Sequence, residues 1–540
     1  MPEIVLTADK TLMSDYGGNE FLGFAACAPA VIPERIYEWI FCSPVPTASD
    51  GSAVYAPYGL RLIEASLLES GFAEDEVVVV HPSKLKDAVD ESTKVIGIST
   101  NDPLGLGPAS STFSDIAAKE TFSAKSFRTL LATVRKLRRT VIVGGPGAWQ
   151  LEDERIAASF GIDCVIIGEG EIVAPRIFHA ALKGEKLPRF VHGEVAPLEK
   201  IPRIRGAAVN GLVEICRGCG RGCKFCNPTM RQFRCKPLPW ILEEARLNFR
   251  TRGYVLLHAE DVLRYNAKQI EPDVASVRSL FEAVKGVIFE EREKGEKEKK
   301  EKKEKKRGRE EREERGRKLG RLFGGRRNGN CEGEVPIGIS HFAFSSVVAA
   351  PEAVAEISRI LELGTRERPW LAGQVGIETG SARMVEMHMR GKARPFSPSE
   401  WSDVVLEAHE ILKENCWVPC STLIVGMPGE KPSDVIQTIE LVERLRPYKS
   451  LIVPLMFVPI GILDRERFFS SRNFLPEHWM LLASCLKHDF HWLYTLIDEY
   501  FGMSRTSKLR VKIIKGFAKY AEKKIKPYIA DMEQGKDPRK

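Results

Sequence analysis

Three cysteines in a glycine-rich segment constrain this chain more than any other feature. Cys219, Cys223 and Cys226 form a C-x3-C-x2-C pattern, and glycines lie at three positions between Cys216 and Cys226. Cysteine thiolates are the usual ligands of iron–sulfur clusters, and three of them can hold one face of a [4Fe–4S] cluster. The fourth iron is then open to a substrate or cofactor. We therefore predict that these three cysteines bind such a cluster.

Other roles for the cysteines stay open on sequence alone. A structural zinc site would use four ligands, but zinc ribbons and fingers usually separate two cysteine pairs by roughly 12–20 residues, whereas here only three residues separate them. A disulfide framework is not expected in a large chain without a secretion signal. Most of the twelve cysteines should then be reduced thiols. For Cys216 we favour a free thiol at the end of a strand over a fourth cluster ligand.

The flanks of the cysteine segment strengthen this interpretation. Residues 211–215 have the pattern of a strand, and residues 237–250 have helical spacing. The order strand, cysteine loop, helix resembles the start of the radical S-adenosylmethionine (radical SAM) superfamily. The resemblance implies a [4Fe–4S] cluster that binds SAM at its open iron. It also implies a reductant protein as partner and a 5′-deoxyadenosyl radical that abstracts hydrogen from carbon, chemistry that belongs to the cofactors.

The N-terminal part alternates apolar strands with helices. Strands are predicted at residues 77–80, 95–100, 140–143 and 163–167, with a helix over 57–71. Continuous apolar strands of this kind predict a parallel, doubly wound sheet. Ligands of such sheets lie at the carboxyl ends of the strands. The residues expected at that rim are Ser99, Thr100, Gly144, Gly145, Glu169 and Gly170.

This region is similar to the cobalamin-binding domain that precedes many radical SAM domains. The similarity rests on Gly-Ile-Ser-Thr, Gly-Gly-Pro and Gly-Glu-Gly-Glu at the strand ends, and it implies that the rim residues bind cobalamin. The motif Asp-x-His-x-x-Gly, whose histidine ligates cobalt in the family, is absent; His81 follows a strand but precedes Pro82. A domain that has kept the fold without the cofactor remains an alternative.

Residues 211–460 resemble the radical SAM partial barrel, with strands expected at 212–215, 254–258, 337–345, 372–377, 417–425 and 449–457. The chemistry of such barrels lies at the carboxyl ends of the strands. The resemblance implies that Phe225 lies against the adenine of SAM and that Gly426 admits the edge of that ring. It implies that Glu260 meets the SAM amino group, although the family's two preceding glycines are here His258 and Ala259.

Further residues are assigned by the same resemblance. Glu378 and Ser381, in Gly-Ile-Glu-Thr-Gly-Ser, would face the ribose and carboxylate of SAM. Asp261 and Tyr265 are candidates for the substrate side. The sequence does not assign a catalytic acid or base.

The positive net charge belongs to one segment. The chain carries +7, whereas residues 291–327 contain 18 Lys/Arg and 10 Glu, so the remainder carries −1. That segment has a single aromatic residue, Phe323, on which a base could stack, so we expect no nucleic-acid partner. A solvated helical or disordered insertion is favoured. The longest apolar stretch, residues 451–463, is interrupted by two prolines and too short to span a bilayer. With no secretion signal recognised, a cytoplasmic location is expected.

The sequence thus predicts an α/β protein with four regions. These are an extension at 1–50, a doubly wound cobalamin-binding-like domain at 51–200, a partial (β/α)6 radical SAM barrel at 205–463 with the charged insertion at 289–330, and a helical region at 464–540. The resemblance, of the archaeal class B type, favours cobalamin-dependent methylation of an unactivated carbon on a protein side chain, lipid or small metabolite. Carbon–carbon bond formation on a lipid is one alternative. Another is a non-catalytic iron–sulfur electron-transfer or scaffold protein, with Cys216 or Cys235 as fourth ligand.

Overall fold

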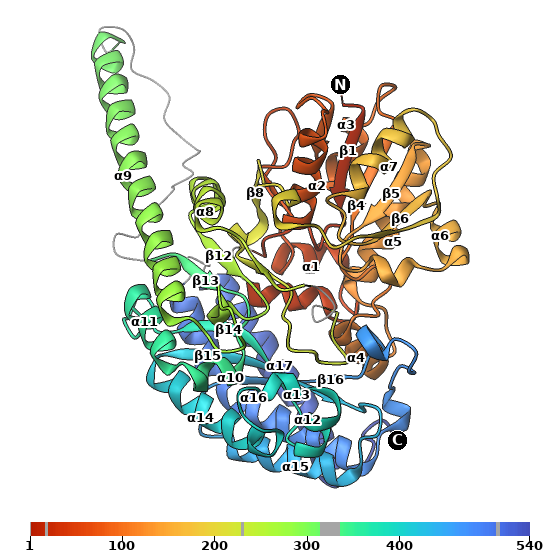
Figure 1. Cartoon of the computed structure of the whole chain (residues 1–540), viewed down its shortest axis with the longest axis vertical. Coiled ribbons are helices and arrows are strands. Elements are labelled where there is room, and N and C mark those ends of the chain that lie inside the picture. The colour runs from red at the N-terminus through yellow and green to blue at the C-terminus, as the bar shows by residue number, and fades with distance from the viewer. Residues whose placement is uncertain (1, 17–19, 228–231, 314–334, 504–507) are drawn as a thin grey trace.

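A computed structural model describes residues 2–16, 20–227, 232–313, 335–503 and 508–540. Two α/β bodies lie side by side, one built on an N-terminal sheet and one on two C-terminal sheets (Figure 1). Smaller elements connect or flank them: α1 (Glu34–Ile40), α3 (Leu85–Ala88), the pair β2 (Tyr55–Ala56) and β8 (Ala207–Ala208), and the pair β10 (Cys216–Arg217) and β11 (Arg234–Cys235).

The N-terminal sheet has six parallel strands in the order β3-β1-β4-β5-β6-β7. They are β1 (Ile4–Ala8), β3 (Val77–Val79), β4 (Val95–Ser99), β5 (Thr140–Gly144), β6 (Cys164–Gly168) and β7 (Phe190–Gly193). One face packs on α2 (Tyr58–Glu69) and α7 (Val173–Leu182), and the other on α5 (Phe122–Val134) and α6 (Glu154–Phe160). Burial of both faces explains the continuous apolar strands and confirms the predicted parallel, doubly wound sheet.

Two strands of this sheet were not predicted. β1 pairs with both β3 and β4, so it lies inside the sheet, although the sequence placed residues 1–50 in an extension outside it. β7 closes the other edge beside β6, and its four residues are only partly buried. β1 is as long and as buried as β4, so its apolar pattern was present in the sequence and was missed, whereas β7 is a partly exposed edge strand without that pattern.

The C-terminal strands form two parallel sheets. β9 (Leu212–Glu214), β12 (Val255–His258) and β13 (Ile337–Ile339) make one, and β14 (Leu371–Glu378), β15 (Trp417–Val425) and β16 (Leu451–Met456) make the other. One isolated parallel bridge, His341–Gln374, joins them. We call these six strands the C-terminal arc. Every predicted strand has a counterpart, and the strands expected to form a partial barrel are here divided into two three-stranded sheets.

The helices of the arc alternate with its strands and bury one large core. They are α8 (Leu238–Arg252), α9 (Val274–Glu313), α10 (Phe344–Ala349), α11 (Pro351–Leu361), α12 (Ala382–His388), α13 (Arg390–Ala393), α14 (Trp401–Glu414) and α15 (Pro432–Arg444). Gly253 ends α8 in a left-handed conformation, as the predicted strand–loop–helix order requires.

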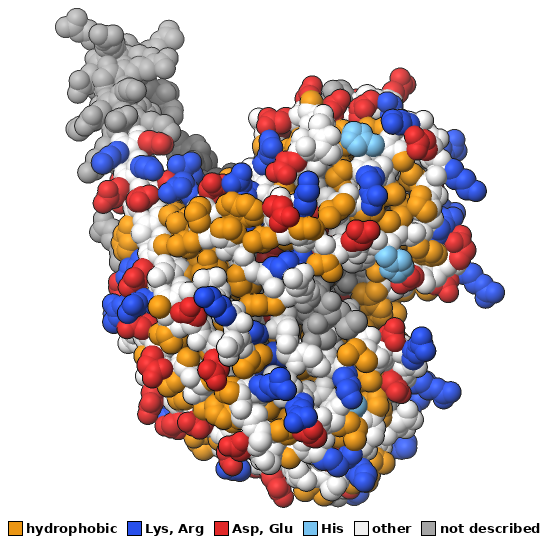
Figure 2. Space-filling view, in the orientation of Figure 1, with side chains coloured by type: hydrophobic (Ala, Val, Ile, Leu, Met, Phe, Trp, Pro, Cys, Tyr) orange, Lys and Arg blue, Asp and Glu red, His pale blue; other side chains and the backbone are white. Residues whose placement is uncertain are grey.

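The charged insertion lies between β12 and β13, as the sequence indicated. Its described part, residues 289–313, continues α9, whose first turns are anchored by Val277, Phe281, Val284 and Ile288. The remainder of α9 projects away from the body (Figure 1). On the face drawn in Figure 2, basic and acidic side chains of the described residues are interspersed rather than gathered into one basic patch.

The C-terminal region is helical, with α16 (Pro476–Met503) packed on α17 (Lys508–Glu533). α4 (Pro108–Ala117), from the N-terminal body, reaches the arc: the Met456 N–H donates to Thr112 Oγ1 at 2.7 Å, and Ser470 Oγ donates to Asp115 at 2.9 Å. None of the described helices combines the length and apolarity that a membrane span needs.

Candidate functional site

A cavity of about 300 Å³ lies where the N-terminal body meets the arc. Its walls include the carboxyl ends of β4, β5 and β6 on one side and Leu212, Glu214, Arg217 and His258 on the other. Both a doubly wound sheet and a barrel place their ligands at the carboxyl ends of their strands. Here those ends, from both bodies, line one common cavity.

The predicted rim residues of the N-terminal sheet divide into two groups. Ser99, Gly144, Gly145, Glu169 and Gly170 line the cavity. Thr100 does not: it is fully buried, and its backbone N–H donates to the Gly144 carbonyl at 2.8 Å. Gly145 has φ +105°, and a Cβ there would lie 2.5 Å from the Thr100 carbonyl oxygen. Only glycine fits this turn, which brings backbone to the cavity wall.

Glu169 lines the cavity, but protein groups take up its carboxylate. Arg217 approaches it at 3.1 Å, Arg234 forms a second ion pair, and the Ala196 N–H donates to it at 2.9 Å. Burial alone would raise the pKa of Glu169, but Arg234 and the other partners outweigh it and lower the pKa. Glu169, which the resemblance assigned to cobalamin, therefore connects the two bodies through its ion pairs with Arg217 and Arg234.

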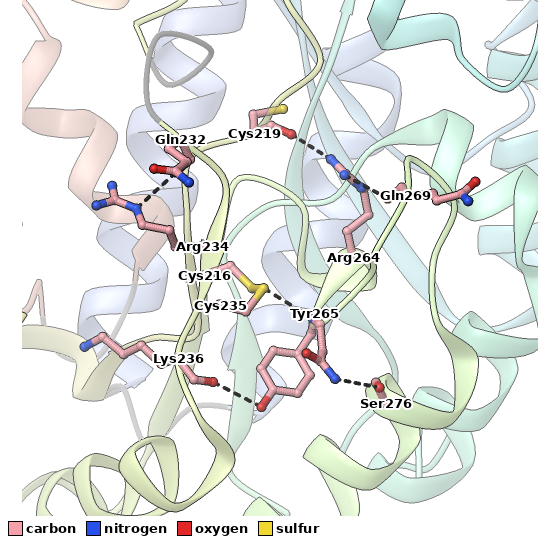
Figure 3. Close-up of a disulfide and its surroundings, with 11 residues drawn as sticks. Cys216, Cys219, Gln232, Arg234, Cys235, Lys236, Arg264, Tyr265, Gln269 and Ser276 are labelled. Atoms are coloured by element: carbon pink, nitrogen blue, oxygen red, sulfur yellow. Dashed lines mark hydrogen bonds between the residues drawn. A yellow bond between two sulfur atoms is a disulfide. The ribbon is translucent and has the colours of Figure 1, made fainter. Parts of the chain in front are cut away.

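Cys216 and Cys235 form a disulfide across the antiparallel pair β10–β11, with Cα atoms 4.0 Å apart (Figure 3). The Asn266 N–H donates to Cys235 Sγ at 3.2 Å. The expectation of a free Cys216 thiol is wrong, because the strand register places these residues opposite each other, which spacing alone does not reveal. While this bond is intact, neither residue can serve as a fourth cluster ligand.

The three predicted ligands lie within the loop that this disulfide closes. Cys223 is buried and Cys219 and Cys226 are half-buried, all as free thiols. Arg264 donates to the Cys219 carbonyl at 2.6 Å (Figure 3), and the Ile462 N–H donates to the Lys224 carbonyl at 2.9 Å. Among the described residues no three His, Cys, Asp or Glu gather closely enough to hold a single metal ion.

A lysine that the sequence did not single out lies beside these thiols. Burial raises the pKa of Cys223 to about 11, against the opposing charge of Lys392. Lys392, on α13, pairs with Glu378 at the end of β14, and Thr422 Oγ1 donates to the same carboxylate at 3.2 Å. Burial works to lower the pKa of Lys392, but Glu378 and Cys223 outweigh it and raise the pKa. A buried cation and anion thus lie together next to the cysteine loop.

Two residues expected at SAM have other contacts. Ser381 is fully buried; its hydroxyl donates to Asp434 at 2.6 Å and accepts from the Met384 N–H as the N-cap of α12. Beside Gly426 lies the ring of Phe469, so that a Cβ on Gly426 would come 2.1 Å from it. In this structure Ser381 caps α12 and Phe469 lies against Gly426, and the assignment of both positions to SAM stays a prediction.

The other assigned aromatic and acidic residues are mostly within the protein core. Phe225 is buried in the main cluster of the arc. Asp261 pairs with Arg221 at 3.0 Å, and the Tyr265 hydroxyl donates to the Lys236 carbonyl at 3.2 Å. Glu260 is half-buried, and its charge contributes, after burial, to raising the pKa of Cys226 to about 12. Asp261, through its pair with Arg221, and Glu260, through its charge on Cys226, both lie beside the cysteine loop.

His258 is a candidate proton acceptor that the sequence left without a role. It ends β12 and lines the cavity, and its Nδ1 lies 2.9 Å from Ser340 Oγ. Ser340 Oγ also lies 3.2 Å from the Ala259 carbonyl, and if its hydroxyl hydrogen is donated there, Nδ1 of His258 is the donor to Ser340 and Nε2 keeps a lone pair. Burial, reinforced by His341, lowers the pKa of His258.

Comparison with known proteins gives a structural likeness only. No family model and no curated protein sequence matches the chain. A structure of the radical S-adenosylmethionine methyltransferase TsrM from Kitasatospora setae, with tryptophan substrate and a SAM analog bound, has a TM-score of 0.50 at 13% identity over 85% of this chain and 75% of that one. The two chains share a fold. A second TsrM structure from this organism, with cobalamin and a [4Fe–4S] cluster bound, has a TM-score of 0.49 at 12% identity over 85% and 73%.

Proposed function

We propose that this chain is a radical SAM enzyme that methylates an unactivated carbon with the help of cobalamin. The observation that carries the proposal is the shared cavity, which the glycine-rich rim of the N-terminal sheet and the start of the cysteine segment bound together. The fold shared with a radical SAM methyltransferase supports it. The substrate class remains a protein side chain, lipid or small metabolite.

The residues fit the implied cofactors. Three free thiols in one loop, with a cation beside them, suit an iron–sulfur cluster. A wall of glycine backbone beside an apolar cavity suits a large flat ring with an apolar appendage. When bound, the cluster and SAM supply a 5′-deoxyadenosyl radical and cobalamin supplies the methyl group.

The chain's own residues would bind and orient the cofactors and the substrate, and would exclude water from them. Cys219, Cys223 and Cys226 would hold the cluster. The buried pair Lys392–Glu378 presents opposite charges, which match the carboxylate and ammonium of SAM, and Glu260 offers a second carboxylate. His258 lines the same cavity, with its Nδ1 2.9 Å from Ser340 Oγ.

The deciding experiment uses the full chain made anaerobically with cobalamin supplied and the cluster reconstituted. We expect about four irons and one cobalt per chain, and, with dithionite, 5′-deoxyadenosine from SAM. Cys223→Ala should lose the iron and the cleavage while keeping the cobalt. Iron without SAM cleavage would support an electron-transfer or scaffold role instead. Cleavage without cobalt would overturn the methyl-transfer mechanism and favour other radical chemistry.

A further inference from the structure

A second cavity, of about 180 Å³, lies at the opposite end of the C-terminal arc from the cysteine loop. Its walls include Trp370, just before β14, and Trp417, the first residue of β15. Glu378, which pairs with Lys392 beside the cysteine loop, is the last residue of β14. The eight residues of β14 span roughly 25 Å in extended conformation. This second cavity is therefore separate from the one assigned to the cofactors.

Aromatic and apolar side chains make most of the wall, namely Trp370, Trp417, Val418, Pro419 and Tyr448. The two indole N–H groups already have acceptors. Trp370 Nε1 donates to Glu499 at 2.7 Å, and Trp417 Nε1 donates to Ser358 Oγ at 2.8 Å. A ligand therefore meets ring surface and hydrocarbon on these walls, and we call this space the aromatic cavity.

Two lysines at the aromatic cavity have anionic partners. Lys413 Nζ lies 3.1 Å from the Glu410 carboxylate, and Lys449 Nζ lies 2.7 Å from the Glu499 carboxylate. An anionic ligand would have to compete with these carboxylates for the ammonium groups, and a charge left without a partner is costly to bury. The charges around the cavity therefore favour a neutral ligand.

His409 gives the aromatic cavity a hydrogen-bond acceptor without a donor. It lines the cavity, is 1% exposed, and places its Nδ1 2.7 Å from the Val405 carbonyl. A carbonyl oxygen can only accept, so Nδ1 carries the hydrogen. Burial lowers the pKa of His409 to about 4, so the ring is neutral at pH 7 and Nε2 has a lone pair. Nε2 has no hydrogen-bond partner among the described residues, and a buried acceptor without one is costly.

The size of the cavity sets the size of the ligand. A dry apolar cavity of roughly 150 Å³ can bind benzene, so about 180 Å³ holds one small ring system. We propose that the aromatic cavity binds a small neutral aromatic molecule of the indole or phenol class, which donates its N–H or O–H to His409 Nε2. Its ring packs on Trp417 and Tyr448. This site needs neither the cluster nor cobalamin and does not depend on the function proposed above.

The first test compares ligands on the full, unaltered chain by calorimetric titration. Indole is compared with benzofuran, which has the same shape but a ring oxygen in place of the N–H. We expect about one indole per chain and roughly 10- to 100-fold weaker binding of benzofuran, whose oxygen would face the Nε2 lone pair. Equal affinities, or no binding of indole, would overturn the proposal.

The same titration distinguishes a free molecule from an aromatic side chain of a peptide. N-acetyltryptophanamide carries the indole ring on a peptide backbone, for which the cavity has no room. We expect it to bind more weakly than indole. Tighter binding of N-acetyltryptophanamide would contradict a site for a free small molecule and indicate a peptide ligand instead.

Variants of two cavity residues locate the site. His409→Phe keeps a ring but removes the acceptor, so it should bind indole and benzofuran equally. His491→Phe, at an exposed histidine of α16, is the matched control and should keep the preference for indole. Val418→Phe fills part of the cavity and should weaken indole binding at least about tenfold. Val31→Phe, at a residue that is 67% exposed, should not change it.

Either variant can contradict the proposal. A preference for indole that persists in folded His409→Phe protein would show that Nε2 is not the acceptor. Undiminished indole binding in folded Val418→Phe protein would show that indole binds elsewhere. Because the ligand comparison uses the unaltered chain, it decides the question even where a variant does not fold.

Discussion

Arg217 Nη1 lies 2.7 Å from the Glu171 carboxylate, and this contact joins the cysteine segment to the loop after β6. The same guanidinium reaches Glu169 at 3.1 Å and Glu214 at 2.9 Å. All four side chains are at most 11% exposed. Arg217 therefore contacts three buried carboxylates at the boundary between the two bodies, and Arg234 and Lys236 add further positive charge at Glu169 and Glu214.

Removing the Arg217 cation should destabilise the protein strongly. Arg217→Met leaves three carboxylates close together with less compensation, and breaking a buried pair typically costs about 3–5 kcal/mol. The matched control is Arg128→Met, whose partner Glu120 and own side chain are 39% and 57% exposed, and which should cost less than about 1 kcal/mol. Urea unfolding midpoints measure both. Equal small effects would show that the Arg217 network does not stabilise the fold.

The same network predicts that the folded protein loses stability in acid. Burial would raise the pKa of Glu214, but Arg217 and Lys236 outweigh it and lower the pKa to about 2. In the unfolded chain a glutamate titrates near 4.3. Because the folded pKa is the lower one, the stabilisation is complete above about pH 5 and is lost as pH falls toward 2. Urea midpoints measured from pH 6 to 2.5 should fall over this window, and Arg217→Met should flatten the slope.

The fold was predictable where strands are long and apolar. The runs that became β4, β5 and β15 are buried on both faces, so their hydrophobic pattern identified them and their order indicated parallel sheets. β1 carries the same signal as β4 and was overlooked, whereas β7 lacks it because it lies partly exposed at an edge. Pairing registers, such as Cys216 opposite Cys235, depend on chain path between elements and cannot be obtained from spacing.

Substituting the disulfide cysteines should affect iron binding differently from substituting the three predicted cluster ligands. Cys216→Ala/Cys235→Ala should retain about four irons per chain, because neither residue belongs to the predicted ligand set, whereas Cys219→Ala, Cys223→Ala or Cys226→Ala should each lose the cluster. Iron analysis with the absorption spectrum measures this. Thiol titration of the unfolded, unreduced protein should also find two thiols fewer than after reduction. Loss of iron in the double variant would refute the three-ligand assignment.

The candidate site was predictable to the extent that strand ends define it. Ser99, Gly145 and Glu169 were placed at the rim because parallel strands align their carboxyl ends. Lys392 and His258 were not assigned, because their importance comes from contacts with Glu378 and Ser340 that lie in other elements. Ser381 is the N-cap of α12, a structural role that a serine before a helix commonly has and that the motif alone did not reveal.

The Lys392–Glu378 pair allows a test that separates SAM binding from stability. Either single variant, Lys392→Met or Glu378→Gln, leaves one buried charge and should lower the urea midpoint, while the double variant should recover much of the loss. All three should bind SAM at least tenfold more weakly, because the charges that match SAM are gone. Lys413→Met, an exposed lysine on α14, is the control. Normal SAM affinity in the double variant would contradict the assigned role.

Gly426 should tolerate no side chain, mainly because an added Cβ would overlap a neighbouring ring. A Cβ there would overlap the Phe469 ring at 2.1 Å, and its φ of +80° adds strain. Gly253→Ala isolates the strain, because Gly253 has φ +70° and no atom within 4 Å of an added Cβ. We expect about 1 kcal/mol of destabilisation for Gly253→Ala and about 1–3 kcal/mol more for Gly426→Ala. If Phe469 is the cause, Gly426→Ala should cost less in a Phe469→Ala background, and additive effects in urea unfolding would show that it is not.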